Sequence, residues 1–502
     1  MNSEGVEDWN NEERLTRRVS PLQRELFLEQ LRWSRCRLER WLRLFTAFLC
    51  GIFFLVRTSA VAATITSDYT TLGLITDDIS AGTVNGGALS DTFVSGGNIS
   101  ISGAATVSLL SGGVLRVGKA GNFTTISGGE LTISAAATLG TISGGVVKAA
   151  GTASVLRITG GTVTFSLAGS TNTIGTLSGG SVINYTNLQV FSGSYAGQMS
   201  GNGSLEKVSG GTLSLSGNNV YTGGTKLSAG IININSATAL GTGTVTFSGA
   251  DIDNSSSSVI TLSNNNTQIW NSSFTFQGTN ALNLGTGNVV LGITPTINVA
   301  ASTLTVGGVI SGMSYGLVKL GAGTLVLTGN NSYSGNTTIS AGILQVGDSG
   351  YSGRLSGSSQ IINSGTLIFN RANTLTQGAD FGSVISGSGV VMQIGAGALT
   401  LSGTNTFSGG FNLSAGQVNL NSAGALGVGG LFVIGGGAIN NSSAAVVTLS
   451  ANIPELWNAN VSFVGGNSLH LGAGAVTMSG TRTVTVRGSL EDGSLCWDRS
   501  FG

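Results

Sequence analysis

Apolar and polar residues alternate in short runs along most of the chain, and the segment from Lys319 to Gly347 shows this pattern most clearly. Leu325 and Leu327 fall on one side of the first run, and aliphatic residues recur at Ile339 and Leu344. A period of two residues is typical of β-strands. Each run is closed by Gly, Asn or Ser, which tolerate positive φ or bond to their own backbone. The segment therefore predicts short strands joined by tight turns, without helix.

Two other segments repeat this pattern without an insertion, one starting at Lys207 and one at Gln393. Aliphatic residues recur on the inward side, and Asn and an aromatic residue recur in the turn. The shared positions are Leu213, Leu215, Asn219 and Tyr221 in copy 1, Leu325, Leu327, Asn331 and Tyr333 in copy 2, and Leu399, Leu401, Asn405 and Phe407 in copy 3. Such a unit cannot bury its apolar side alone, so it must stack on neighbouring units.

The repeated segment resembles the autotransporter-associated β-strand repeat, also called the passenger-associated transport repeat. Its motif reads roughly Gly-x-Gly-Thr-Leu-x-Leu-(Ser/Thr)-Gly-x-Asn-x-(Tyr/Phe)-(Ser/Thr)-Gly. The resemblance implies an all-β fold, a single-stranded right-handed parallel β-helix or β-solenoid, carried to a bacterial cell surface. It implies no enzymatic activity, because the repeat occurs in passengers of varied chemistry.

A simpler repeat precedes the first copy. An aliphatic residue followed by Ser or Thr and two glycines recurs at Val94, Leu110, Ile126, Ile142, Ile158 and Leu177. The first four steps are 16 residues long and the last is 19. One period could make one narrow coil or part of a wider coil, and periodicity leaves both possibilities open. We predict a short-repeat solenoid over residues 63–205 and a solenoid of the longer repeats over residues 206–493.

Residues 1–62 differ in kind and indicate a targeting segment. An Arg-rich stretch precedes the apolar run Leu44–Val56, and Ala60 and Ala62 form an A-x-A site. A membrane-spanning helix needs about 20 apolar residues, whereas this shorter run fits a signal peptide. We predict a signal peptide with a long, helical leader, cleaved before Ala63, and hence a secreted or cell-surface protein. A retained anchor is the alternative, and a misassigned start is also open.

Composition changes this picture little. Charged residues are 9% of the chain against about a quarter in typical domains, so Ser, Thr and Asn must solvate the surface. No basic patch suggests nucleic-acid binding. Cleavage would leave Cys496 as the only thiol, which excludes an intramolecular disulfide. We expect no membrane span in the mature part, and no translocator barrel, because no series of amphipathic strands follows Val486.

The repeat pattern breaks at residues 494–502, an aberrant C-terminal tail reading SLCWDRSFG. The tail stands where a new copy of the longer repeat should open. A truncated or frame-shifted gene would explain it, and so would a polar cap on the solenoid. The sequence leaves both explanations open.

Candidates for chemistry are few, and comparison between repeats weakens each of them. The sole histidine, His470, aligns with Asn283. Asp251 and Asp253 share one side of a strand, as paired catalytic carboxylates would, but Ala438 and Asn440 occupy the corresponding positions. The string Gly312–Gly316 matches a nucleophile elbow by chance, because no helix is expected after it. We therefore expect no catalytic residue, no metal ligand and no cofactor.

Two function classes remain. The first is a structural or adhesive surface passenger, with an unknown surface ligand or none. The alternative is a carbohydrate-active β-helix enzyme, a lyase or glycosidase. Such an enzyme would bring several carboxylates or basic residues together in one groove. A sequence so poor in charge favours the first class.

Overall fold

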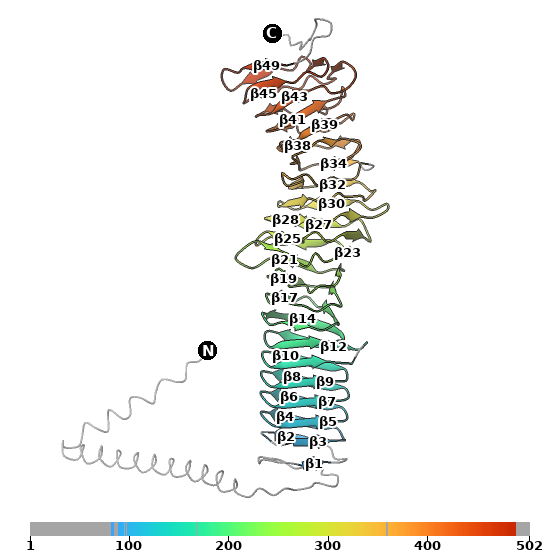
Figure 1. The fold of residues 1–502 in the computed structure, drawn as a ribbon, viewed down its shortest axis with the longest axis vertical. Coiled ribbons are helices and arrows are strands. Elements are labelled where there is room, and N and C mark those ends of the chain that lie inside the picture. Colours follow the sequence, from blue (N-terminus) through green and yellow to red (C-terminus); the bar gives the residue numbers. More distant parts are fainter. Residues whose placement is uncertain are drawn as a thin grey trace, which may run out of the picture. The chain divides into compact units, whose positions relative to one another are not determined.

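The computed structural model describes residues 82–84, 89–94, 96, 98–167, 169–357 and 360–487. Within these residues the chain forms only strands, bends and turns, and the paired strands run parallel to each other. Figure 1 shows the coils stacked on one another from β1 to β49. The all-β parallel solenoid is therefore confirmed. The predicted leader helix lies outside the described residues, and the handedness stays a prediction.

The solenoid has three faces, and each face is a stack of strands from successive coils. Face one begins with β1 (Gly82–Val84), β3 (Asn98–Ile101), β5 (Val114–Val117), β7 (Glu130–Ile133), β9 (Val146–Ala149), β11 (Thr162–Phe165), β13 (Ser181–Asn184) and β15 (Met199–Ser200). It continues with β22 (Ile260–Thr261), β25 (Leu282–Asn283), β28 (Thr303–Val306), β31 (Thr324–Leu327), β33 (Ile343–Val346), β35 (Thr366–Phe369), β38 (Val390–Gln393), β40 (Phe411–Leu413), β42 (Phe432–Ile434), β45 (Glu455–Trp457) and β48 (Val476–Met478).

Face two follows face one along the chain. It begins with β2 (Leu89–Val94), β4 (Ala105–Leu110), β6 (Gly121–Ile126), β8 (Ala137–Ile142), β10 (Ala153–Ile158), β12 (Thr171–Leu177), β14 (Asn187–Tyr195), β16 (Ser204–Lys207), β18 (Thr225–Leu227), β20 (Val245–Phe247), β23 (Gln268–Trp270), β26 (Val289–Leu291) and β29 (Ile310–Ser311). It continues with β36 (Leu375–Thr376), β39 (Ala398–Leu401), β41 (Gln417–Leu420), β43 (Ala438–Asn440), β46 (Val461–Phe463) and β49 (Val484–Val486).

Face three starts at the end of β14. It comprises β17 (Thr212–Leu215), β19 (Ile231–Ile234), β21 (Asp251–Asp253), β24 (Phe274–Phe276), β27 (Thr296–Val299), β30 (Leu317–Leu320), β32 (Thr337–Ile339), β34 (Ile361–Asn363) and β37 (Ile385–Ser386). After an interruption it resumes with β44 (Val447–Thr448) and β47 (Leu469–His470).

The 16-residue repeat makes one narrow coil per period. In the ladder of face two, Val107 pairs with Phe123, Phe123 with Leu139, and Leu139 with Val155, each step being one period. All four side chains are buried. The Gly-Gly turn closes each coil, with the second glycine in the left-handed region that disfavours other residues, as at Gly145 with φ 72°. The question that periodicity left open is thus settled in favour of the narrow coil.

The coil widens at β14, which bends and contributes to two faces. Its first half pairs with β16 on face two, whereas Gly193 to Tyr195 pair with β17 and open face three. At Gly193, φ is 142° and a Cβ atom would lie 1.8 Å from the Leu177 carbonyl oxygen. Only glycine fits this bend.

The three long repeats do not occupy the same faces. Their equivalent strands are β17 on face three, β31 on face one and β39 on face two. In each copy a loop replaces the strand of the next face over two coils, on face one in copy 1, face two in copy 2 and face three in copy 3. The loops keep backbone bonds to the coil below, such as Val220 N to Met199 O, Ser332 N to Ile310 O and Thr406 N to Ile385 O. Each copy is therefore rotated by one face relative to the copy before it.

Candidate functional site

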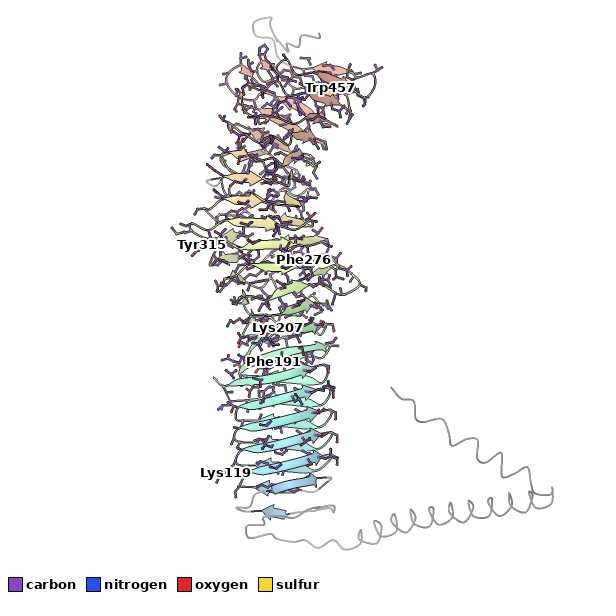
Figure 2. All side chains as sticks on the ribbon, turned by 180° about the vertical axis from the view of Figure 1, so that it is seen from behind. Lys119, Phe191, Lys207, Phe276, Tyr315 and Trp457 are labelled. Atoms are coloured by element: carbon purple, nitrogen blue, oxygen red, sulfur yellow. The ribbon has the colours of Figure 1, made fainter. Side chains whose placement is uncertain are left out.

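The shared positions of the three repeats all lie inside the solenoid. Their exposed fractions are at most 2%, at Leu213, Leu215, Asn219 and Tyr221, at Leu325, Leu327, Asn331 and Tyr333, and at Leu399, Leu401, Asn405 and Phe407. The aromatic residues Trp270, Phe276, Trp457 and Phe463 of the corresponding later segments are buried as well. Figure 2 marks Phe276 and Trp457 on the stacked coils. The repeat thus supplies core residues and leaves no part of its motif side chains for an external ligand.

The repeat Asn ties three coils together. In copy 1, Asn219 Oδ1 accepts a bond from the Met199 backbone N–H (2.9 Å), and its Nδ2 donates to the Ala239 carbonyl (2.7 Å). Asn331 and Asn405 make the equivalent bonds to the coils below and above them. Each amide satisfies buried backbone groups that the loop leaves without a strand partner.

A long polar side chain fills the corner at the start of each copy. Lys207 is fully buried, and its Nζ donates to three carbonyls, those of Val208 (2.8 Å), Ser209 (2.7 Å) and Ala229 (3.1 Å). Lys319 makes the same three contacts in copy 2. In copy 3, neutral Gln393 donates to two turn carbonyls instead. Burial lowers the pKa of Lys207 to about 8. Both lysine ammonium groups therefore bond to the carbonyls of their corner, and Figure 2 labels Lys207 on the stacked coils.

A pair of buried hydroxyls is present in copies 1 and 2, and both hydroxyls are absent from copy 3. The Tyr221 and Thr225 hydroxyls lie 2.6 Å apart, and those of Tyr333 and Thr337 lie 2.7 Å apart. In copy 3 both positions are phenylalanine, Phe407 and Phe411. Burial raises the pKa of both tyrosines far above their usual value. Their phenols are thus neutral packing elements.

The paired carboxylates of β21 are used by the next coil. Asp251 Oδ1 accepts the Thr275 backbone N–H (2.7 Å). Asp253 accepts the backbone N–H (3.0 Å) and the hydroxyl (2.6 Å) of Thr279. Both aspartates therefore connect successive coils.

The other two candidates from the sequence are His470 and the Gly312–Gly316 string, which lie on different coils. His470 lies on β47 with Thr448 beside it in the ladder. The Gly312–Gly316 string forms a loop after β29, in which Ser314 has φ 66°, and strand β30 follows rather than a helix. Within the described ranges, no cluster of three or more His, Cys, Asp or Glu side chains could hold a metal ion. The cleavage-site residues Ala60, Ala62 and Ala63 lie outside those ranges.

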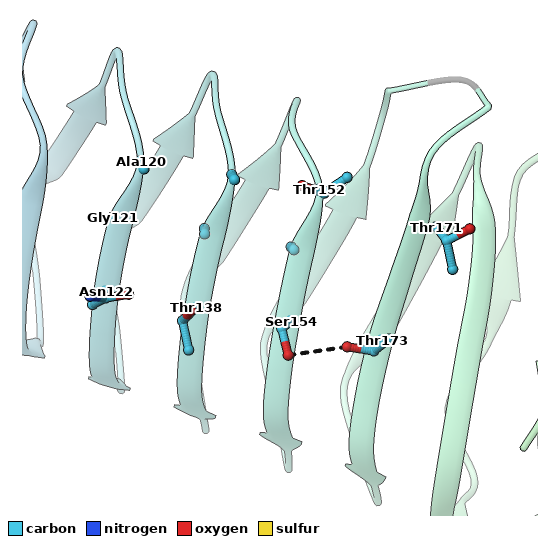
Figure 3. A pocket seen from close by; sticks show the side chains of 11 residues that line it. Ala120, Gly121, Asn122, Thr138, Thr152, Ser154, Thr171 and Thr173 are labelled. Atoms are coloured by element: carbon cyan, nitrogen blue, oxygen red, sulfur yellow. Dashed lines mark hydrogen bonds between the residues drawn. The ribbon is translucent and has the colours of Figure 1, made fainter. Parts of the chain in front are cut away.

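The surface that the structure describes includes two hollows of several hundred Å³. The first, of about 350 Å³, crosses the start of β6, β8, β10 and β12 and is lined by small residues such as Gly121, Ala137 and Ala153. Figure 3 shows Asn122, Thr138, Ser154 and Thr173 along successive strands beside it, with a bond of 3.1 Å between the last two hydroxyls. This groove carries no charged side chain.

The second hollow, of about 390 Å³, lies where copy 2 interrupts face two. Arg354 and Ser332 line it, and Asp380 forms an ion pair of 4.0 Å with Arg354. Arg371 comes from the following coil, is buried, and donates to the Gly353 carbonyl of the loop that carries Arg354. The sequence analysis did not find these residues. The signal that could have shown them is the segment after the last strand of copy 2, residues 347–360, which is longer than the corresponding segments of copies 1 and 3.

No helix long and apolar enough to cross a membrane occurs in the portion of the chain that the structure describes. Comparison with known proteins places the repeats in a family. Residues 205–234, 317–346 and 393–420 match the family model of the passenger-associated-transport-repeat. No solved structure matches the chain.

Two curated proteins are similar over part of their length. Over 199 residues, 39% of this chain, the sequence is 30% identical to the adhesin BmaC autotransporter of Brucella suis biovar 1 (strain 1330), of which 5% is covered. Over 75 residues, 15% of this chain, it is 40% identical to an extracellular serine protease of Serratia marcescens, of which 7% is covered. The chain thus spans only a small part of both relatives. The chain therefore carries three copies of the passenger-associated-transport-repeat, stacked in one solenoid.

Proposed function

We propose that this chain is an exported, passenger-type solenoid with a structural or adhesive role and no catalysis of its own. The observation that carries the proposal is the use made of polar side chains. Asn219, Lys207 and Asp253 each bond to backbone groups of a neighbouring coil. Chemistry-bearing residues are thus committed to holding coils together, and the similarity to an autotransporter adhesin agrees with this role.

The division of the chain belongs to the same proposal. Residues 1–62 are a signal peptide with an extended leader, cleaved before Ala63. Residues 63–205 and 206–493 are the two solenoid segments, and residues 494–502 are a separate tail. Support comes from the Arg-rich leader, the apolar run and the A-x-A site, together with the similarity to an autotransporter.

An enzymatic role finds less support. A lyase or glycosidase would need carboxylates that converge on bound sugar. Asp251 and Asp253 instead accept bonds from Thr275 and Thr279 of the next coil. The similarity to a serine protease covers 7% of that protein and carries no argument for proteolysis by this chain.

The test follows the full-length chain in a Gram-negative host. Mass spectrometry of the exported protein should find Ala63 as the mature N-terminus, and externally added protease should reach the protein on intact cells. The purified exported chain should then retain attachment to cultured epithelial cells or to surfaces coated with laminin or mucin. Heat-unfolded chain is the control. An uncleaved protein inside the cell, or cleavage of casein or polysaccharide by the chain itself, would contradict the proposal.

A further inference from the structure

The hollow on face two exists because copy 2 interrupts that face. Its floor is formed by the loops between β29 and β36, and it measures about 390 Å³. The second of these loops runs from residue 347 to 360, whereas the equivalent loops of copies 1 and 3 run from 235 to 244 and from 421 to 431. A volume of about 300 to 1,000 Å³ is typical of small-molecule sites. The longer loop of copy 2 contributes Arg354, Leu355, Ser356 and Gly357 to the lining of this hollow.

A buried arginine holds this longer loop in place. Arg371 is 7% exposed, and its guanidinium donates to the carbonyls of Tyr351 (2.7 Å) and Gly353 (3.0 Å) and to Asn373 Oδ1 (2.6 Å). Burying a charge is costly unless hydrogen bonds compensate it. Here the compensating carbonyls belong to the surface loop itself. The buried charge thus fixes the loop conformation, as a preorganised binding site requires.

The loop presents a second arginine whose donors are not used up. The Arg354 backbone is anchored, since its N–H donates to Gly329 O (3.1 Å) and its carbonyl accepts from Asn331 Nδ2 (2.8 Å). The Arg354 side chain is 44% exposed. Its Nη1 lies 4.0 Å from Asp380 Oδ1, which is beyond hydrogen-bond distance. Asp380 is turned to the backbone, where Oδ2 accepts the Thr376 N–H (2.9 Å). The guanidinium therefore lines the hollow with free donors.

We propose that this hollow binds an acidic saccharide, with the sugar carboxylate on the Arg354 guanidinium. A planar guanidinium matches a carboxylate through two parallel hydrogen bonds. Ser332 supplies a hydroxyl to the same hollow, and Gly357 and Gly378 leave room beside it. Tyr351 does not line the hollow but lies on the same loop as Arg354, 78% exposed and held through its carbonyl, so its ring is available to a sugar unit that extends out of the hollow.

The lining favours a saccharide over an apolar peptide side chain. Leu355 is the one large apolar residue among the lining residues that the structure describes, and it is itself buried. Arg354 is the one charged residue among the lining residues that the structure describes, and its positive charge favours an acidic ligand. The inference rests on the proposed adhesive role, because it names the class of ligand that such a role would use.

The test is a calorimetric or NMR titration of the full-length exported chain. The probes are 3′-sialyllactose and a hyaluronan hexasaccharide, with lactose as the neutral counterpart, acetate as the bare carboxylate and a glutamate-rich peptide. We expect one acidic saccharide to bind at least tenfold more tightly than lactose, acetate or the peptide. Equal binding of acetate would mean a simple anion site, and tighter binding of the peptide would mean a protein ligand. Either result, or no saccharide binding at 10 mM, overturns the inference.

Variants locate the binding. Arg354→Gln should weaken acidic saccharide binding at least tenfold, and Tyr351→Ala should weaken it to a lesser degree. Arg157→Gln, an exposed arginine on β10, is the matched control and should leave binding unchanged. Unaltered thermal unfolding of each variant shows that the fold persists. Unchanged binding by Arg354→Gln overturns the inference. Attachment to cells without saccharide binding overturns the inference alone, whereas saccharide binding without attachment removes only the adhesive role.

Discussion

The narrow coils of residues 98–167 and the wide coils that begin at β14 differ in the interactions that close each coil. Within 98–167 every buried position is apolar or glycine. The wide coils bury polar side chains in every copy of the long repeat, including Asn219, Asn331 and Asn405. At the two-residue glycine turn of a narrow coil, backbone bonds such as Ser127 N to Leu110 O close the corner, and the Ser127 hydroxyl donates to the same carbonyl. A loop that replaces a whole strand leaves backbone groups that need side-chain partners.

The comparison teaches where each region is vulnerable. The narrow coils depend on backbone conformation at the turn glycines, where φ is positive and a Cβ atom would meet the backbone of the coil below. The wide coils depend on a few buried amides and one long polar side chain per copy. Substitutions at these two kinds of position should therefore have large effects in their own region. Exposed side chains of the same types should have small effects.

The largest effect should follow a change at a narrow-coil turn. At Gly145, φ is 72° and a Cβ atom would lie 2.5 Å from the Gly129 carbonyl oxygen. Gly145→Ala should lower the free energy of unfolding by about 3 kcal/mol, because left-handed strain and a backbone clash add together. Gly169→Ala is the control, since φ there is 77° but nothing lies within 4 Å. It should cost only about 1 kcal/mol in denaturant titration. Equal losses would show that the clash does not matter.

The next effect should follow the loss of a repeat amide in a wide coil. Asn219→Ala leaves the Met199 N–H and the Ala239 carbonyl without the bonds that Asn219 gives them. An unpaired buried group costs about 1 to 3 kcal/mol, so we expect a loss of about 2 kcal/mol or more. Hydrogen exchange at Met199 should accelerate in parallel. Asn122→Ala, exposed on a narrow coil, should stay within about 0.5 kcal/mol. Wild-type exchange at Met199 in the variant would argue against the tie.

A smaller effect should appear in the hydroxyl pair. Tyr333→Phe or Thr337→Val alone removes one partner of a buried bond of 2.7 Å and should cost about 1 kcal/mol. The double variant should be closer to wild type than the two single losses predict, because no hydroxyl is left unpaired. Copy 3 already has this arrangement with Phe407 and Phe411. A double-mutant cycle measures the coupling energy, and strict additivity would refute the pairing.

The smallest effect concerns pH. Burial lowers the pKa of Lys207 from 10.5 to about 8 in the folded protein. The unfolded chain then binds more protons between about pH 8 and 10.5, so this group makes stability rise with pH across that window. Lys207→Gln, which imitates Gln393, should flatten that part of the stability profile. An equal slope in wild type and Lys207→Gln would contradict the assignment.

Most of the repeat architecture could be predicted from sequence because it depends on local pattern. The alternation at Leu325 and Leu327 indicated buried strand positions, and both are buried. The hollow at Arg354 could not be predicted in this way. It depends on Arg371, 17 residues later in the chain, which approaches the loop only after the coil closes. The contacts of Asp251 and Asp253 with Thr275 and Thr279 could not be predicted either, because they form only where one coil stacks on the next.

The sequence by itself determined the strand type, the inward positions and the turn glycines, because alternation and positive φ are properties of neighbouring residues. Only the tertiary structure decided that one 16-residue period is one whole coil, since that depends on Val107 meeting Phe123 in a ladder. It also decided that the three copies rotate from face to face. Different numbers of strands and loops separate the copies, and the face on which a copy begins depends on how many strands precede it. No pattern of neighbouring residues records that number, because it accumulates over several coils.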